Sequence, residues 1–457
     1  MMLPDSGAGL QPGERFADFV VGAMPPSAAR QAAARALLDT IGVTLAGAAE
    51  PASRIVQQVI AQDGAGPCAV LGTPLRASAS NAALANGTAA HALDYDDMCF
   101  VSLAHPSAPL VTAALAAAEL TGASGGMLLD GYIVGFEIEG RLGRAMNPRH
   151  YQRGWHCTST LGTIGAAAAA SRVLGLDRAA AGHALAIAAS EASGLKENFG
   201  TMVKPLHAGL AARNGVLAAL LARNGMTASG QALDGPQGFL AAMDSERTGL
   251  ADASADLGVR WEILDTGITV KLYPSCAGTH PTLDAILDLR QREGFTAEDV
   301  ERIDIQVDSI TPTVLIYERP ASGLEAKFSM PFCAAAAVVY GRVGIDTFEA
   351  ASLNEIRVMR LMPRIAMRVD PSLDASGPPL TQARVGIQLR GGRTVSQAAN
   401  GARGYPERPA SAAELGAKFM ACARRALPDT AARSALAMLQ EIDTLDDIRS
   451  LTDVLQP

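Results

Sequence analysis

Two neighbouring segments of the sequence hold an unusual density of side chains that can bind or move protons. AHALDYDD at residues 90–97 has three carboxylates within four positions, and AHPS at residues 104–107 adds a histidine and a serine. Carboxylates this close repel one another unless a cation, a metal or a bound proton relieves them. On these residues alone, a helix that ends in solvated aspartates explains the pattern better than a site. The residues concerned are Asp94, Asp96, Asp97, His105 and Ser107.

A second segment, GWHCTSTLG at residues 154–162, combines a histidine with side chains that can cap a helix. If Thr158 or Ser159 begins the following helix, the free amides and the dipole at its N-terminus favour a bound carboxylate. His156 would then stand at an anion-binding helix end. A histidine that only fixes the loop is about equally compatible with these residues.

Lysine is rare in this chain, which makes its positions informative. Five of the 38 basic residues are lysine, and a buried lysine can lose its proton whereas arginine effectively cannot. Lys204 directly precedes Pro205, a favoured first-turn residue, so Lys204 and a helix N-terminus would together form a cationic niche, with His207 close by in the sequence. Leftover lysines in a genome that favours arginine codons are the alternative. The five are Lys196, Lys204, Lys271, Lys327 and Lys418.

The segment KLYPSCAGTH at residues 271–280 contains Lys271, Tyr273 and Cys276, and it lies where the pattern changes from helical to mixed. A residue at such a boundary can reach into a cleft between domains, where ligand sites prefer to form. No evident Cys/His/Asn pattern marks Cys276 as a nucleophile, so a structural thiol is the better interpretation.

Composition excludes several classes of function. The net charge of −8 argues against nucleic-acid binding, although one pocket can still be positive. The six cysteines form no C-x-x-C pair, and the motifs of nucleotide-binding proteins, serine hydrolases and zinc proteases are absent. There is neither an apolar run of about 18 residues nor a secretory signal. We therefore expect a cytoplasmic protein that uses no metal or cofactor and binds neither nucleic acid nor membrane.

The elements that position these residues fall into three stretches. From Pro25 to about Leu264 the spacing is helical, with a helix that Ser27 can cap and Ala-rich helices at about 78–93, 106–121, 125–145, 158–174, 178–194 and 207–224. After Gly267, alternation predicts strands at 302–308, 364–370 and 383–389, and the turn Gly391–Gly392 indicates a fourth strand at 393–397. Helices are expected at 278–293, 329–341 and 347–359. Helices return at 411–426, 429–441 and 446–455.

This order predicts a mainly α protein with an α+β second domain. Residues 1–267 would begin a large helical domain, 268–402 would form a smaller α+β lid, and 403–457 would complete the helical domain. The active site would lie between the two domains, where the segment that starts at Lys271 enters the lid.

Six motifs in this order resemble the MmgE/PrpD family over almost the whole chain: AHALDYDD, AHPS, GWHCTSTLG, KPLHAG, KLYPSCAGTH and GLEAKFSMPF. That family includes 2-methylcitrate dehydratase, cis-aconitate decarboxylase and iminodisuccinate epimerase. The resemblance implies a helical domain built from both chain ends, an α+β lid, a homodimer and a small polycarboxylic acid as substrate. The family's pocket residues are matched by Asp94, His105, His156, Lys204 and Lys271.

The resemblance also implies proton-transfer chemistry. Lys204, Lys271 and helix N-termini would bind the substrate carboxylates, and the lysines would stabilise a developing enolate. A neutral His105 or His156 would remove the proton next to a carboxylate, the other would protonate a leaving hydroxyl, and Asp94 would orient a neighbouring histidine. Further substrate contacts are expected from Ser107, Thr158, Ser159, His207, Tyr273 and Cys276.

Three activities stay open. A hydro-lyase of the 2-methylcitrate dehydratase kind leads, and an epimerase (isomerase) of an iminodisuccinate-like dicarboxylate follows, because both begin with the same proton abstraction. Cis-aconitate decarboxylation is less favoured: Cys276 replaces a histidine of that branch, Met98 replaces a threonine, and the stretch from Asp94 to His105 is one residue longer. A homologue that only binds a carboxylate ranks last, because the ionisable residues of all four segments are present.

The remaining lysines and histidines are expected outside the chemistry. Lys327 is predicted to be structural, and Lys196 and Lys418 are predicted to lie on the surface. Supporting positions around the pocket are predicted for His91, His207 and His280, and positions outside it for His150 and His183.

Overall fold

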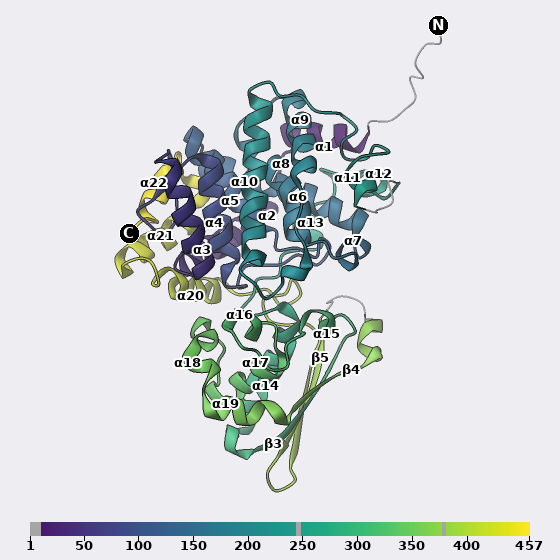
Figure 1. The fold of residues 1–457 in the computed structure, drawn as a ribbon, viewed down its shortest axis with the longest axis vertical. Helices are drawn as coiled ribbons and strands as arrows, with labels where there is room; N and C mark the ends of the chain where they lie inside the picture. Colours follow the sequence, from purple (N-terminus) through teal and green to yellow (C-terminus); the bar gives the residue numbers. More distant parts are fainter. Residues whose placement is uncertain (1–10, 244–247, 377–380) are drawn as a thin grey trace.

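The computed structural model describes residues 11–243, 248–376 and 381–457, and shows a helical unit above a smaller unit in which helices cover a sheet (Figure 1). Each unit has its own hydrophobic core. The first core runs from Phe16 to Val270 and resumes from Ala410 to Leu455. The second runs from Tyr273 to Ala399. The protein is therefore mainly α with a smaller α+β unit, as predicted, and both chain ends contribute to the larger core.

The larger unit packs its helices around α8, which contacts α5, α6, α9 and α10. Its N-terminal helices are α1 Pro12–Gly22, α2 Ser27–Gly47, α3 Pro51–Ile60, α4 Ala79–Ala92, α5 Ser107–Thr121, α6 Gly125–Met146, α8 Cys157–Val173, α9 Arg178–Glu191 and α10 Val203–Arg223. Shorter elements are η1 Ala61–Asp63, β1 Cys68–Ala69, β2 Arg76–Ala77, α7 Arg149–Gln152, η2 Lys196–Asn198, α11 Phe239–Ala242, α12 Thr248–Ala253 and α13 Glu262–Asp265. The returning chain adds α20 Ala412–Ala423, α21 Asp429–Gln440, η8 Ile442–Thr444 and α22 Arg449–Val454.

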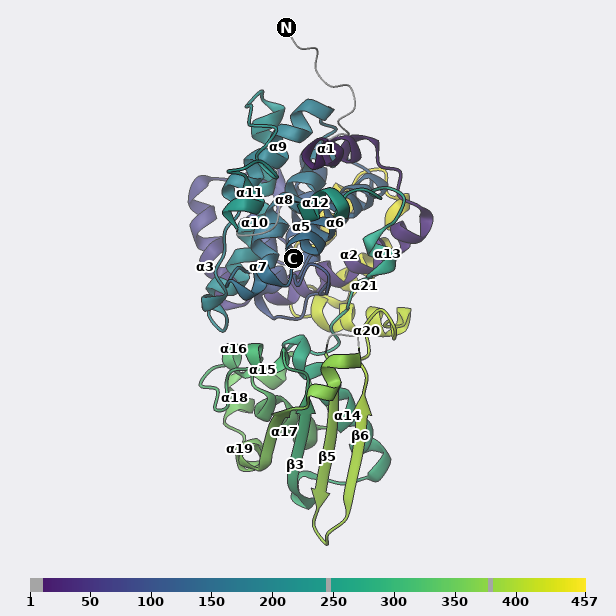
Figure 2. The same cartoon turned by 90° about the vertical axis from the view of Figure 1, so that its right-hand side faces the viewer.

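The smaller unit contains a four-stranded mixed sheet in the order β4-β3-β5-β6. The central strand β3 (Val300–Val307) pairs in parallel with β4 (Ile365–Val369) and antiparallel with β5 (Ala383–Leu389), which forms a hairpin with β6 (Thr394–Ala399). Helices α14 (His280–Glu293) and α17 (Met330–Tyr340) pack on this sheet (Figure 2). The predicted strands are confirmed. The other elements are η3 Ala277–Thr279, η4 Ala297–Asp299, α15 Thr311–Val314, α16 Gly323–Ala326, η5 Ile345–Phe348, α18 Ala350–Leu353, α19 Ile356–Leu361, η6 Met362–Arg364 and η7 Pro371–Ser376.

Several predicted helix details are wrong. Ser27 is the first helical residue of α2 and Pro26 precedes it, so Ser27 does not cap the helix. Helix α10 begins at Val203, which places Lys204 inside its first turn. The helix predicted at 347–359 is broken into η5, α18 and α19, because the backbone is extended at Glu349 and Glu355. Helices α1 and α3 were not predicted.

Two segments that join the units run beside each other. Thr269 exchanges two backbone hydrogen bonds with Met98, at 2.8 and 2.9 Å, and the Val270 amide donates to the Gly404 carbonyl at 2.8 Å. Gly404 has a φ of +89°, and a Cβ there would collide with the carbonyl of Val270. This pairing sets Lys271 against the loop that carries Asp94.

Within the described residues, no single helix is long and apolar enough to cross a membrane. Helix α2 reaches the length and apolar composition of a membrane span only together with α3 and η1, and the two parts are bent by 85° relative to each other. Side chains of α2 and α3 pack into the first core.

Close helix contact through glycine generates the first prediction. A Cβ at Gly209 of α10 would collide with Thr88 and with the Leu84 carbonyl of α4. Gly209→Ala should therefore lower the free energy of unfolding by about 1–3 kcal/mol, because overpacking forces two helices apart. Gly182→Ala is the matched control, because its Cβ would have only Ala17 nearby, at 3.7 Å. Its free energy of unfolding should rise by about 0.5–1 kcal/mol. Urea unfolding midpoints measure the stability of both variants, and equal changes in stability would contradict the close contact at Gly209.

Candidate active site

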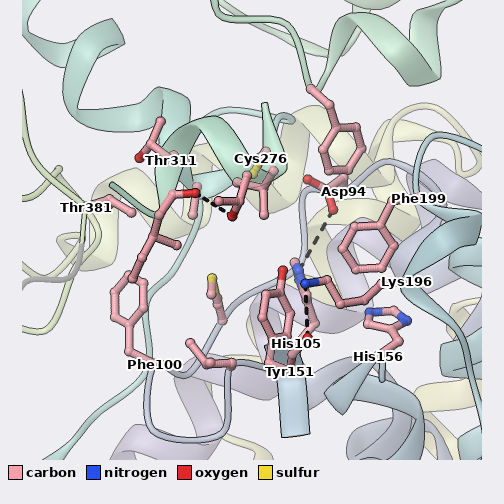
Figure 3. A pocket seen from close by; sticks show the side chains of 18 of the residues that line it. Asp94, Phe100, His105, Tyr151, His156, Lys196, Phe199, Cys276, Thr311 and Thr381 are labelled. Carbon is pink, nitrogen blue, oxygen red and sulfur yellow. Dashed lines mark hydrogen bonds and ion pairs between the residues drawn. The ribbon is translucent and has the colours of Figure 1, made fainter. Parts of the chain in front are cut away.

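A cavity of about 430 Å³ lies where the two units meet, and side chains of both units line it (Figure 3). The larger unit contributes loops after α4 and before α8 and the first turn of α10. The smaller unit contributes the segment after Lys271 and loops around α15. All five residues predicted to be catalytic line this cavity, namely Asp94, His105, His156, Lys204 and Lys271.

Asp94 is a buried carboxylate between two lysines. Lys204 Nζ donates to its Oδ1 at 2.6 Å, and Lys271 Nζ donates to its Oδ2 at 2.9 Å and to its carbonyl oxygen at 3.0 Å. Burial alone would raise the pKa of Asp94, but the charges of Lys204 and Lys271 outweigh it and hold the pKa well below its usual range. Asp94 also has a φ of +51°, an unusual backbone conformation for a residue other than glycine.

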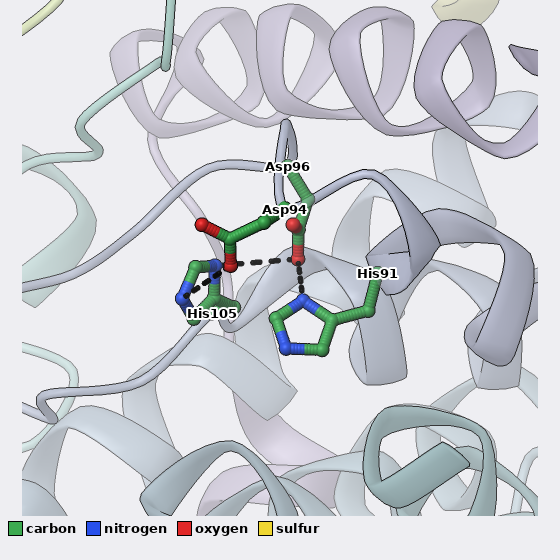
Figure 4. Close-up of side chains that lie close together, drawn as sticks. All are labelled: His91, Asp94, Asp96 and His105. Carbon is green, nitrogen blue, oxygen red and sulfur yellow. Dashed lines mark hydrogen bonds and ion pairs between the residues drawn. The ribbon is translucent and has the colours of Figure 1, made fainter. Parts of the chain in front are cut away.

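Asp96, not Asp94, is the carboxylate that orients the histidines (Figure 4). Its Oδ2 lies 2.8 Å from His91 Nδ1 and 3.4 Å from His105 Nδ1. Lys204 Nζ lies 2.7 Å from His91 Nε2. Because an ammonium has only donors, His91 Nε2 must accept, and His91 Nδ1 therefore donates to Asp96. Burial opposes ionisation of Asp96, but His91 and His105 outweigh it and lower its pKa.

His105 lies between two carboxylates. Its Nδ1 is 3.4 Å from Asp96 Oδ2 without forming a hydrogen bond, and its Nε2 is 3.9 Å from Asp94 Oδ1. Burial, with Lys271 among the opposing charges, lowers the pKa of His105 to about 3 although Asp96 acts to raise it. His105 is thus a neutral imidazole at neutral pH.

His156 is a second neutral imidazole in the cavity. It occupies the position before α8, as expected, and its carbonyl accepts from the Ser159 and Thr160 amides. Its Nδ1 lies 3.0 Å from His207 Nδ1. Burial and then the charge of Lys204 lower the pKa of His156 well below its usual range.

Asp97 is the third carboxyl of the run and is relieved by a proton. Ser107 donates to it from both its amide and its hydroxyl, and Tyr132 OH lies 2.7 Å from that hydroxyl. Burial raises the pKa of Asp97 to about 8. The three carboxyls are thus relieved in three ways: by lysines, by imidazoles and by a proton. The interpretation of Asp94, Asp96 and Asp97 as solvated aspartates is wrong, since all three are buried.

Most residues predicted to contact the substrate directly lie behind the lining of the cavity. Ser107 binds Asp97, and Thr158 Oγ1 accepts the His105 amide at 3.0 Å. Ser159 Oγ donates to the His207 carbonyl at 3.3 Å. These hydrogen bonds point the side chains at the protein, so their effect is to position His105 and His156.

Of the two lid residues predicted to contact the substrate, one lines the cavity and the other does not. Tyr273 OH donates to Asp284 at 2.6 Å and accepts from Arg403 at 2.8 Å, and it does not line the cavity. Cys276 does line it. Burial, followed by the charge of Asp94, raises the pKa of the Cys276 thiol, which disfavours a thiolate.

Two lysines predicted to lie on the surface belong to the site. Lys196 lines the cavity, with Nζ 3.4 Å from the centre of the Tyr151 ring and donating to the Tyr151 carbonyl at 3.1 Å. Lys418 is buried and donates to the carbonyls of Tyr95 and Lys271, both at 2.8 Å. The rarity of lysine was the one sequence signal that could have found them.

The remaining lysine and histidines lie where they were expected. Lys327 Nζ binds the carbonyls of Leu93 and Pro274, at 2.6 and 2.9 Å, a structural role. His280 binds the Ser275 carbonyl close to the cavity. The other two histidines do not line the cavity; their partners are Thr160 for His150 and the Ala228 backbone for His183.

Four ligand-type atoms, from His91, Asp94, Asp96 and His105, lie within 4.8 Å of one another. Lys204 and Lys271 already contact both oxygens of Asp94, and Lys204 also contacts Nε2 of His91. A divalent ion would meet two ammonium groups at the place it would occupy, so these residues fit cationic side chains better than a metal.

Comparisons with known proteins cover nearly all of the chain. Residues 14–249 match the model of the MmgE/PrpD N-terminal domain and residues 273–444 that of the MmgE/PrpD C-terminal domain. Cis-aconitate decarboxylase of Mus musculus is 30% identical over 437 residues, which cover 92% of this chain and 88% of that protein. The Homo sapiens protein of the same name is 29% identical, covering 93% and 90%. That of Aspergillus terreus is 26% identical, covering 94% and 92%.

The buried proton on Asp97 generates a prediction for stability. Its folded pKa of about 8 exceeds the usual value of 3.8, so between these values the folded state holds more protons and stability falls as pH rises. Asp97→Asn removes this titration. Its stability relative to the wild type should grow by about 3 kcal/mol from pH 5.5 to 8.5. Unfolding midpoints at both pH values measure this, and Asp252→Asn, at an exposed position, is the control. If Asp97→Asn and the wild type differ in stability by the same amount at both pH values, Asp97 does not hold a proton in the folded state.

Proposed function

Because the chain belongs to the MmgE/PrpD family, we propose that it is a lyase that acts on a small polycarboxylic acid by acid–base chemistry of its own side chains. The proposal rests on the observation that two neutral imidazoles, of His105 and His156, line the same cavity as three lysines. Neutral imidazoles accept protons, and ammonium groups bind carboxylates and stabilise an enolate. Relatives named cis-aconitate decarboxylase support a carboxylate substrate.

Lys204 and Lys271 are suited to bind the substrate while they bind Asp94. An ammonium has three donors. Lys204 uses two of them, on Asp94 and His91, and Lys271 uses two on the side chain and carbonyl of Asp94. Within the described contacts, each lysine keeps one N–H for a substrate carboxylate. Asp94 thereby fixes the direction in which both remaining donors point.

His105 is the proposed base. Its Nε2 removes the proton next to a bound carboxylate, and Asp96 at Nδ1 stabilises the imidazolium that forms. The negative charge moves onto the substrate carboxylate as an enolate and is stabilised by Lys204 and Lys271. His156 is the proposed acid, because an anionic substrate beside it raises its affinity for a proton.

Dehydration stays the leading reaction, in which His156 protonates the leaving hydroxyl. Decarboxylation is the second candidate, and one observation favours it: the relatives named above carry that activity in their names and match over most of their length. Cys276 and Met98, which depart from that branch, both line the cavity and weigh against it. Epimerisation needs the same base without a leaving group. From the family resemblance we also propose a homodimer.

The experiment is an incubation in D₂O with 2-methylcitrate, citrate, cis-aconitate and iminodisuccinate, followed by proton NMR. An alkene product from a hydroxy acid indicates dehydration, CO₂ loss indicates decarboxylation, and exchange without an alkene indicates epimerisation. His105→Gln should lower turnover and deuterium exchange by at least about 100-fold. His156→Gln should lower turnover by a similar factor but leave the rate of deuterium exchange unchanged, because His105 still removes the first proton.

The control is His183→Gln, whose ring binds the Ala228 backbone outside the cavity. It should keep wild-type turnover and exchange. No reaction with any of the four acids would overturn the proposed substrate class, and loss of exchange in His156→Gln with its retention in His105→Gln would reverse the assignment of base and acid.

The depressed pKa of His105 generates a pH prediction. A group with a folded pKa of about 3 stays in the basic form above that pH. The specificity constant kcat/KM, which reports the free enzyme, should therefore change little between pH 7.5 and 5 through titration of His105, where an imidazole with the ordinary pKa of about 6.5 would lose roughly thirtyfold. A pH profile of kcat/KM measures this, and an acid limb near pH 6.5 that is traced to the enzyme would contradict the assignment.

A further inference from the structure

The cavity has two chemically different ends. The labels of Figure 3 separate Asp94, His105 and His156 on one side from Phe100 on the other. The charged end accounts for the lysines and imidazoles of the proposed chemistry. The far end is lined by apolar side chains, which a substrate made only of carboxylates and hydroxyls would not need. They are Met98, Phe100, Leu103, Ile310 and Val314.

One of these side chains is presented by a strained backbone. In the described parts of the chain, the non-glycine residues with positive φ are Asp94 and Leu103, and both line the cavity. Leu103 has a φ of +49°, where glycine or asparagine would fit with less strain. Such strain persists where the surroundings over-determine it, and it concentrates at ligand sites. At Asp94 the strained backbone positions the carboxylate at the charged end of the cavity. By the same reasoning, the strained backbone at Leu103 positions a side chain at the apolar end.

The loop that carries Leu103 is fixed in place before any ligand binds. The amides of Cys99 and Ala104 each donate to the other's carbonyl, at 2.9 and 3.4 Å, and the Leu103 amide donates to the Phe100 carbonyl at 3.3 Å. Asn147 Nδ2 donates to the Ser102 carbonyl at 2.7 Å. These bonds make the apolar wall a rigid part of the larger unit, which suits recognition of a defined group.

The apolar wall continues on the lid. Val314 of α15 lines it from the lid, and Thr311 and Thr381 also line the cavity. The Phe100 ring packs edge-on against Tyr405, with ring centres 5.3 Å apart. The two threonine hydroxyls are bound by the protein, Thr311 by Asp308 and Thr381 by Tyr405. The apolar side chains of both units therefore offer a surface larger than a methyl group needs.

We propose that the substrate is a polycarboxylic acid with an alkyl substituent longer than methyl, which lies against Met98, Phe100, Leu103 and Val314 while its carboxylates bind the lysines. This inference rests on the proposed function and specifies its substrate class. Each methylene buried against the wall should tighten binding about fourfold.

The experiment separates binding from turnover. Calorimetry measures dissociation constants of propane-, butane-, pentane-, hexane- and heptane-1,2,3-tricarboxylate, which carry no alkyl group or the methyl to butyl groups of the 2-alkylcitrates, but lack the hydroxyl and cannot be dehydrated. In parallel, kcat/KM is measured for citrate and its 2-alkyl homologues. Affinity and kcat/KM should both rise about fourfold per added carbon.

Two variants change the polarity of the apolar wall while keeping its backbone conformation or its shape. Leu103→Asn keeps a residue that tolerates positive φ and removes the apolar side chain, and Val314→Thr keeps the shape and adds a hydroxyl. In both variants, affinity and kcat/KM should rise less than twofold per added carbon. Leu264→Asn, at an exposed leucine of α13 away from the cavity, should keep the full dependence.

The outcomes distinguish this inference from the proposed function. Turnover of citrate with no gain from alkylation overturns the alkyl substrate and leaves the lyase. A chain-length gain in binding without turnover of any acid supports the apolar site and overturns the lyase. A gain that persists in both wall variants overturns the inference, and failure of every acid to bind overturns both proposals.

Discussion

The ion group formed by Asp94, Lys204 and Lys271 is the interaction on which the rest of the site depends. It joins a loop after α4, the first turn of α10 and the segment that enters the lid, three places far apart in the sequence. Burying these charges has a large desolvation cost, and removing one partner would destabilise the fold by about 3–5 kcal/mol, because a buried charge would be left uncompensated. Such a group contributes little net stability, so its benefit lies in the geometry it imposes on the remaining N–H donors.

The backbone around Asp94 is bound by lysine at three consecutive residues. Lys327 binds the Leu93 carbonyl, Lys204 and Lys271 bind Asp94, and Lys418 binds the Tyr95 carbonyl. This explains how Asp94 keeps a positive φ, since its neighbours on both sides are fixed. Lys418 comes from the returning C-terminal helix α20, and Lys327 from the lid. Both units and both chain ends therefore determine the conformation of one residue.

The sequence predicted the fold better than it predicted the roles of side chains. Period-2 alternation located β3 to β5, and the Ala-rich helical spacing located most long helices, because both patterns report burial of one face. The turn Gly391–Gly392 located β6. The motifs named the five residues that line the cavity, but they did not give side-chain direction. Ser107 and Thr158 bind the protein instead of facing the cavity, and Asp96 takes the orienting role predicted for Asp94. Lys418 was missed because its partners lie more than 140 residues away in the sequence.

The charges that bind the substrate also prepare the base. Lys204 and Lys271 disfavour a second positive charge nearby, so they help to keep His105 and His156 neutral. A bound polycarboxylate would cancel much of that positive charge and raise the proton affinity of both imidazoles at the moment a proton must be accepted. Binding and proton transfer are thus coupled through the same lysines. An apolar substituent at the other end of the cavity would exclude water from this exchange and strengthen the electrostatic interactions within it.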